Sequence, residues 1–169
     1  MLRAGLLEDT VVLTAPATGA ASACAALGAE VVTLGAPALD EEAMAAAVDP
    51  RARALVVGGD ELFAEGGLTF ALDAAWCAVR AVANGAFIPG GGGKVVLVAP
   101  RPEAEYAPAL RAGLANLART SSIEWAQYQI TPTAILPGPE TTDDEVAQVV
   151  AYLVSPAGDY FSGCTFELT

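Results

Sequence analysis

Short apolar runs rich in β-branched residues alternate along this chain with alanine-rich stretches that repeat at helical spacing. This alternation is typical of parallel α/β proteins. The apolar runs predict strands over residues 10–14, 30–34, 52–57, 94–99, 130–136 and 164–168. The alanine-rich stretches predict helices over residues 17–27, 40–48, 68–84, 108–125 and 142–153, and the glycine run 90–93 predicts a mobile loop.

Capping residues support two of these helices. Asp40 stands before an alanine-rich stretch, and the acidic residues Glu41 and Glu42 follow it near the positive end of the helix dipole. Thr142 and Glu145 have the spacing of a capping box, which predicts a helix that begins after Thr142.

The order of elements predicts a single domain over residues 1–169, with a Rossmann-like, doubly wound α/β fold. Right-handed crossovers give an open, mainly parallel sheet of about six strands with helices on both faces. Ligands of such sheets bind beyond the carboxyl ends of the strands. In this chain that edge consists of residues 15–19, 58–60, 99–101 and 137–142.

Composition excludes several classes of function. The net charge is −12 and there is no basic cluster, so we expect no nucleic-acid partner. Apolar residues make up 54% of the chain, but no uninterrupted apolar run approaches the roughly 20 residues of a membrane helix. We expect a soluble, cytoplasmic protein without a signal peptide or membrane contact.

Histidine is absent, which excludes Ser-His and Cys-His catalysis and any His-ligated metal, so we expect no metal site. Cys24, Cys77 and Cys164 are odd in number and far apart, which predicts reduced cysteines rather than a disulfide framework.

The C-terminal part of the chain resembles a known family. Residues 114–126 read L-A-N-L-A-R-T-S-S-I-E-W-A, residues 130–142 read I-T-P-T-A-I-L-P-G-P-E-T-T, and residues 144–163 read D-E-V-A-Q-V-V-A-Y-L-V-S-P-A-G-D-Y-F-S-G. This order resembles the C-terminal half of the short-chain dehydrogenases/reductases. The resemblance implies a Rossmann-like oxidoreductase fold and a truncated member, because the strand and helix that support the adenine ring in that family have no counterpart before residue 52.

The cofactor motifs of the family are altered. The family's T-G-x-x-x-G-x-G motif aligns from Thr14 with T-A-P-A-T-G-A-A, so that Gly19 alone fills a glycine position. Gly58 stands within V-G-G-D where the family has N-N-A-G, and Thr141 lies in a turn that resembles P-G-x-x-x-T. We interpret Gly19, Gly58 and Thr141 as vestigial positions and expect no cofactor. The alternative is NAD or NADP at an altered site that uses the amides of Gly19 and Ala20.

The catalytic residues are also displaced. The family uses a tyrosine with a lysine four residues later, and Arg111 stands at the lysine position while Ala107 stands at the tyrosine position. Tyr106 is one residue further back, about 140° around the helix from Arg111 if both are helical. We therefore expect no catalytic residue. The alternative is a rearranged site with Tyr106 as proton donor and Arg111 as electrostatic support.

The helical segments keep the family's apolar stripes. In the family the two equivalent helices pair with those of another subunit, so the resemblance implies a homo- or hetero-oligomer with a subunit of the same type. The expected interface residues are Leu72, Trp76, Val79, Leu110, Leu114, Leu117 and Trp125.

These observations lead to three hypotheses. The first is a catalytically degenerate short-chain dehydrogenase that serves as a structural or regulatory subunit of an oxidoreductase assembly. The second is an NAD(P)-dependent oxidoreductase with the rearranged site. The third is a module that binds a small molecule at the former nicotinamide edge.

Overall fold

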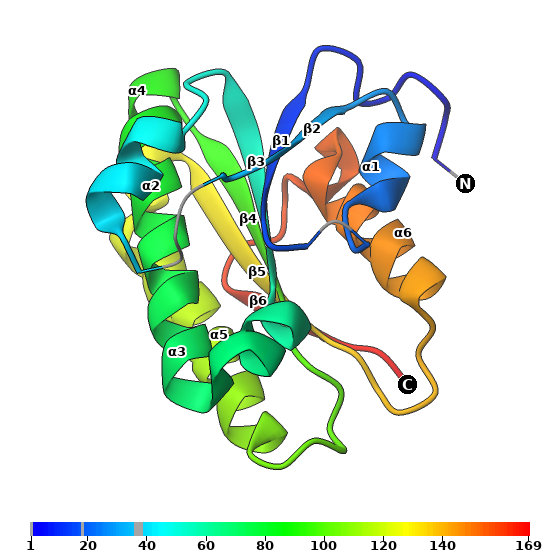
Figure 1. Ribbon diagram of the computed structural model, residues 1–169. Helices are drawn as coiled ribbons and strands as arrows, with labels where there is room; N and C mark the ends of the chain where they lie inside the picture. The colour runs from blue at the N-terminus through cyan, green and yellow to red at the C-terminus, as the bar shows by residue number, and fades with distance from the viewer. Residues whose placement is uncertain (1, 18, 36–38) are drawn as a thin grey trace.

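Six parallel strands form one sheet in the computed structural model, which describes residues 2–17, 19–35 and 39–169 (Figure 1). The strands are β1 (Val11–Ala15), β2 (Glu30–Thr33), β3 (Ala52–Gly58), β4 (Gly93–Val98), β5 (Ile130–Leu136) and β6 (Cys164–Glu167). Their order in the sheet is β2-β1-β3-β4-β5-β6, and every neighbouring pair is parallel. The predicted Rossmann-like α/β fold is confirmed.

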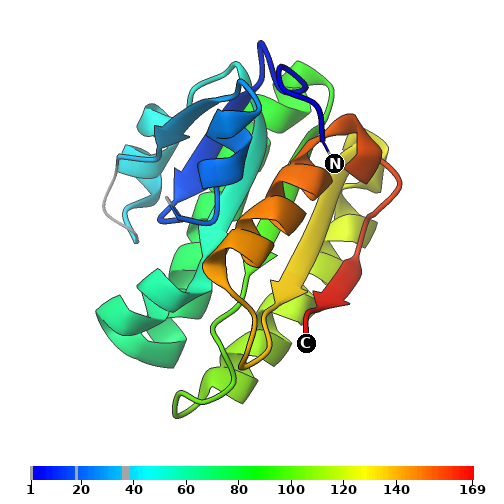
Figure 2. The same cartoon turned by 90° about the vertical axis from the view of Figure 1, so that its right-hand side faces the viewer.

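Helices cover both faces of the sheet (Figures 1 and 2). They are α1 (Ser22–Ala26), α2 (Glu41–Ala47), α3 (Gly59–Val82), α4 (Ile88–Gly90), α5 (Ala107–Glu124) and α6 (Asp143–Val154). The helices α2, α3 and α5 pack on one face and α1 and α6 on the other, and each face has its own apolar core. Because side chains alternate along a strand, the strands β1 to β5 contribute to both cores. In β3, for example, Leu55 faces the first core and Val56 the second.

One crossover has the opposite hand from the others. The chain steps in the same direction across the sheet from β3 to β4, β5 and β6, but α6 lies on the opposite face from α3 and α5. The prediction that all crossovers are right-handed is therefore wrong for the connection from β5 to β6. This connection places α6 over the core that α1, with five residues, covers only in part.

Glycine and turn geometry moved several predicted boundaries. The helix predicted over residues 17–27 is confined to α1, and Gly28 ends this segment at φ 101°; Thr18 lies outside the described residues. The helix predicted from residue 68 begins at Gly59 and is broken at Gly67, whose φ of 74° and ψ of −164° are not helical. Residues 59–66 therefore form a separate short helical segment before the long one.

The glycine run 90–93 was predicted to be a mobile loop, but its first and last residues belong to regular elements. Before it, η1 (Ala83–Phe87) is a π-helical turn that leads into α4. Gly90 ends α4 and Gly93 begins β4, while Gly91 and Gly92 turn the chain with φ values of 78° and 135°. A Cβ at Gly93 would lie 2.3 Å from the Phe87 ring, so the run packs tightly against the core.

Both predicted helix caps are confirmed. The Asp40 carboxylate accepts a hydrogen bond from the Ala43 amide at 2.9 Å, and Thr142 and Glu145 form the complete capping box. The shorter helices η2 (Ala126–Tyr128) and η3 (Pro156–Gly158) connect α5 to β5 and α6 to β6.

The segment Gly59–Gly90 is long and apolar enough to cross a membrane by length and composition alone. Here it lies along the sheet with one face in the core (Figure 1). It also carries the charged residues Asp60, Asp73 and Arg80.

Candidate functional site

The carboxyl edge of the sheet holds a small cavity where the sequence predicted a ligand site. Its volume is about 210 Å³, below the roughly 300–1,000 Å³ of typical small-molecule pockets. The ends of β3, β4 and β5, the turn after β1 and the start of α6 enclose it. The lining residues are Gly19, Ala20, Gly58, Asp60, Glu61, Val98, Arg101, Pro137, Asp143 and Val146.

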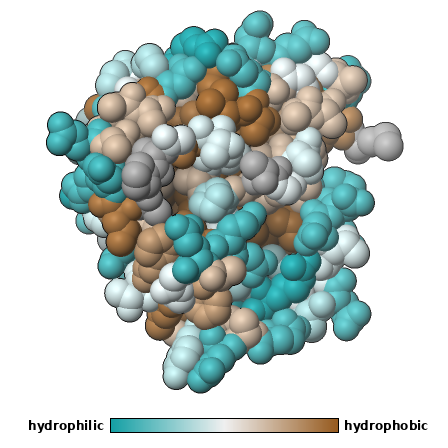
Figure 3. All heavy atoms as spheres, in the orientation of Figure 1, coloured by the Kyte–Doolittle hydropathy of each residue, from teal (hydrophilic) through white to brown (hydrophobic). Residues whose placement is uncertain are grey.

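Carboxylates dominate this cavity. Asp60, Glu61 and Asp143 face a single cation, Arg101. The Arg101 guanidinium lies 2.7 Å from the Asp143 carboxylate and 3.8 Å from that of Asp60, and it also donates to the Thr141 carbonyl at 2.8 Å. The charges of the lining residues therefore sum to −2, and the further cation that acts on Asp60 is Arg111, which lies behind the Pro137 carbonyl. In the orientation of Figures 1 and 3 the carboxyl edge of the sheet is at the bottom, and hydrophilic residues gather at the lower right of the space-filling view.

The environment shifts the pKa values of two of these acids upward. Partial burial raises the pKa of Asp60, whose side chain is still half exposed, and the charges of Arg101 and Arg111 oppose this shift only in part. Burial also raises the pKa of Glu61, and the charges of Asp60 and Asp143 add to the effect. The first cause of both shifts is desolvation, which disfavours the charged forms of these two carboxyl groups.

The two glycines of V-G-G-D are explained by packing. Gly58 donates a hydrogen bond to the Pro16 carbonyl at 2.7 Å, and a Cβ at Gly58 would lie 2.1 Å from that oxygen and 2.2 Å from the Glu61 carboxylate. A Cβ at Gly59 would lie 2.6 Å from the Val98 carbonyl. The space beside Gly58 is thus filled by the turn after β1 and by an acidic side chain.

The vestigial position Thr141 has a structural role. Its hydroxyl accepts a hydrogen bond from the Gly138 amide at 2.9 Å, and its carbonyl accepts from Arg101. Gly19 lines the cavity, but no atom lies within 4 Å of the position that its Cβ would occupy. The altered glycine motif therefore leaves one glycine at the cavity, without close contacts around it.

These residues do not fit a nicotinamide dinucleotide. The pyrophosphate of such a cofactor is anionic, and here it would meet Asp60, Glu61 and Asp143 with one guanidinium that is already paired. At the start of α1 the amides of Ala21, Ser22 and Cys24 already donate to backbone carbonyls of the preceding turn, so they are not free to bind a phosphate.

Arg111 joins two loops. Its Nη1 donates to the Pro100 carbonyl at 2.7 Å and to the Pro137 carbonyl at 2.8 Å. Pro100 lies in the loop after β4, and Pro137 directly follows β5. The residue at the family's lysine position therefore holds the carboxyl edge together, and neither it nor Tyr106 lines the cavity.

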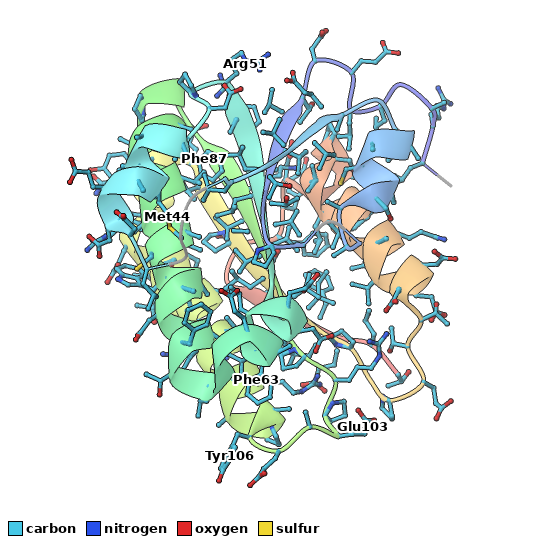
Figure 4. The ribbon with its side chains drawn as sticks, viewed as in Figure 1. Met44, Arg51, Phe63, Phe87, Glu103 and Tyr106 are labelled. Atoms are coloured by element: carbon cyan, nitrogen blue, oxygen red, sulfur yellow. The ribbon has the colours of Figure 1, made fainter. Side chains whose placement is uncertain are left out.

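Tyr106 lies at the N-cap of α5 with φ 65°, as expected from Pro108 in the first turn, and its side chain is 63% exposed. Figure 4 shows it at the outer end of α5, pointing away from the sheet. The structure does not bring Tyr106 and Arg111 together in a common pocket.

Sequence reasoning located this edge but missed its charge. From the sequence, Asp60 and Arg101 were placed at the ends of strands and Asp143 at the start of a helix. Acidic residues are common in the first turn of a helix because they interact favourably with the helix dipole, so they did not by themselves indicate an acidic cavity. The number of acids at one edge is a signal that could have been found, since parallel strands bring all three segments together. Among the described residues, no three His, Cys, Asp or Glu side chains are grouped to hold a metal ion.

The expected interface residues divide into two sets. Val79, Leu110 and Leu114 are completely buried in the chain's own core, so the expectation that they contact another subunit is corrected. Leu72, Leu117 and Trp125 are half-buried, and Trp76 is 36% exposed. We call these four residues, on the outer side of α3 and α5, the outer apolar surface.

Comparison with known proteins identifies the fold. No protein-family model and no curated protein matches the chain. Solved structures do match: over nearly its whole length the chain has the fold of the short-chain dehydrogenases/reductases, as the sequence resemblance implied.

Three of the similar structures show the extent of this likeness. A short chain dehydrogenase from Mycobacterium smegmatis is 22% identical, with a TM-score of 0.80 over 100% of this chain and 95% of that chain. A citronellol catabolism dehydrogenase from Pseudomonas aeruginosa PAO1 is 20% identical, with a TM-score of 0.75 over 99% and 96%. A hydroxysteroid dehydrogenase from Escherichia coli is 16% identical, with a TM-score of 0.75 over 98% and 97%. Each match therefore extends almost from end to end of both chains.

Proposed function

We propose that this protein is a catalytically degenerate chain with the short-chain dehydrogenase fold that acts as a structural or regulatory subunit of a cytoplasmic oxidoreductase assembly. In this proposal it does not bind NAD or NADP. It contacts a second subunit, either its own copy or a chain of the same fold, through the outer apolar surface.

The observation that carries the proposal is the composition of the carboxyl edge. A cavity of about 210 Å³ lined by Asp60, Glu61 and Asp143 repels an anionic cofactor and is too small to enclose one. The groups that the family uses for proton transfer have no equivalent in this cavity. The fold is kept, while the features that bind the cofactor and perform the reaction are not.

The outer apolar surface supports the second half of the proposal. The rings of Trp76 and Trp125 are stacked, with centroids 6.1 Å apart and an angle of 5° between their planes. Leu72 lies over Gly113, where a Cβ would be 2.5 Å from the leucine side chain, so α3 and α5 approach closely and present one joint surface. Large aromatic side chains that are partly exposed over packed helices are enriched at protein interfaces.

Measurement of the mass in solution tests this interface. The chain alone has a mass of 17.0 kDa, and we expect either a multiple of this mass by sedimentation or a heavier complex after co-purification from the native host. Trp76→Glu is expected to reduce the mass to that of one chain. Leu6→Glu is the matched control, because Leu6 is also 36% exposed but lies outside this surface.

The outcome that contradicts the proposal is a single chain of 17.0 kDa in both preparations, or a complex that Trp76→Glu leaves intact. A co-purified partner with the intact glycine and Tyr-Lys motifs of the family supports the assembly with an active relative. A complex of identical chains supports a homo-oligomer.

A further inference from the structure

A second cavity lies at the opposite, amino edge of the sheet. Its volume is about 570 Å³, within the roughly 300–1,000 Å³ range of small-molecule pockets. The lining consists of Arg53, the glycines 90–93, Lys94, Gln129, Thr131 and Asp159. In Figure 4 this edge lies at the top of the molecule, where Arg51 and Phe87 are labelled.

The charge of this cavity is opposite to that of the chain. Arg53 and Lys94 face one acid, Asp159, so one positive charge remains in a protein whose net charge is −12. Lys94 pairs with Asp159 and donates to the Ser155 carbonyl. The Lys94 side chain is only 17% exposed while that of Asp159 is 59% exposed, so the acid is the partner that an incoming anion can displace.

The Arg53 guanidinium uses few of its N–H donors among the residues that the structure describes. Its Nη1 donates to the Ala52 carbonyl at 3.0 Å, and within the described part of the chain no carboxylate lies within 4.0 Å of its guanidinium. The remaining N–H groups form the planar fork that binds carboxylate or phosphate oxygens in pairs.

The glycine run keeps the cavity open. A Cβ at Gly90 would lie 2.6 Å from Arg53 Nη1, so a side chain there would push the guanidinium away. No atom lies within 4 Å of the Cβ position of Gly91, and this open side gives a ligand access to the two cations.

We propose that this cavity is a binding site for a small oxyanion, a phosphate or a carboxylate group of a metabolite. Arg53 binds two of its oxygens, Lys94 supplies a second charge in place of its contact with Asp159, and the polar side chains of Gln129 and Thr131 offer further hydrogen bonds. The site lies at the opposite edge of the sheet from the acidic cavity, and its lining shares no residue with that cavity or with the outer apolar surface.

Calorimetric titration with inorganic phosphate, pyrophosphate and citrate, at constant ionic strength in chloride buffer, tests this site. We expect saturable one-to-one binding of at least one anion with a Kd of about 1 mM or tighter. Arg53→Gln is expected to weaken this binding about tenfold or more, since it removes a charged, paired contact. Arg119→Gln is the matched control, because Arg119 is an exposed arginine on α5 that does not line the cavity.

Stronger binding of the phosphates supports a phosphorylated ligand, and stronger binding of citrate supports a carboxylate. Absence of saturable binding of all three anions, or equal weakening by Arg53→Gln and Arg119→Gln, overturns the proposal. Lys94→Met also removes the contacts with Asp159 and Ser155 and can impair folding. The shift of the Gln129 and Thr131 amide resonances of the parent chain on titration therefore provides the second measurement.

Discussion

Replacement of Arg111 by methionine separates a structural role of this residue from a catalytic one. The substitution keeps most of the apolar side chain and removes the donor that joins the Pro100 and Pro137 carbonyls at 2.7 and 2.8 Å. A hydrogen bond from a charged donor contributes about 1.5–3 kcal/mol. Because water can reach part of this edge, we expect the two contacts together to contribute about 2–4 kcal/mol to the free energy of unfolding.

Urea and thermal unfolding followed by circular dichroism measure this loss. For a chain of this size, about 2–4 kcal/mol corresponds to a fall in Tm of roughly 4–16 °C. Arg111→Lys, which keeps the charge but not the geometry of the fork, is expected to fall between the parent and Arg111→Met. The exposed Arg119→Met is the control and is expected to stay within about 0.5 kcal/mol of the parent. If Arg111→Met is as stable as this control, our assignment of a structural role is wrong.

Three further predictions concern single residues. Gly67→Ala is expected to lower the free energy of unfolding by about 1–3 kcal/mol, because φ 74° with ψ −164° is a conformation that only glycine adopts readily. Gly19→Ala is the control, since its Cβ would meet no atom within 4 Å, and equal urea midpoints for the two variants would contradict the prediction. Since partial burial raises the pKa of Glu61, its charge opposes folding at neutral pH, and this effect disappears as the pH falls through the carboxyl range. Glu61→Gln should therefore raise the free energy of unfolding at pH 7 by less than about 1 kcal/mol after solvent screening, and should no longer do so near pH 4; an equal gain at both pH values would refute the electrostatic cause. Burial raises the pKa of Cys24 to about 11, so at pH 8 the native chain should react with a thiol reagent at the half-buried Cys164 first, and rapid labelling of Cys24 by mass spectrometry would contradict the described burial.

The fold could be predicted from the sequence because its strands differ sharply from its helices. Runs such as residues 94–99 are too short and too rich in valine for helices, and the caps at Asp40 and Thr142 fix where two helices begin. The hand of the last crossover could not be predicted, since the apolar stripe of α6 fits either face of the sheet. The break at Gly67 was also hidden, because a glycine within an alanine-rich stretch does not by itself indicate a positive φ.

The candidate site was predicted less completely than the fold. The sequence located the carboxyl edge and the loss of the family's motifs, but it could not show that Glu61 fills the space beside Gly58. Likewise, periodicity placed Leu110 and Leu114 on an apolar stripe without distinguishing the chain's own core from a contact with a partner. Both distinctions depend on which elements pack together in three dimensions.

Calorimetric titration of the isolated chain with NAD+, NADH, NADP+ and NADPH tests most directly whether the acidic carboxyl edge has lost its dinucleotide. The same titration with Arg53→Gln separates binding of a phosphate group at the amino edge from binding at the carboxyl edge. We predict no saturable binding to this variant by any of the four dinucleotides. Binding in the micromolar range that Arg53→Gln leaves unchanged would contradict the account.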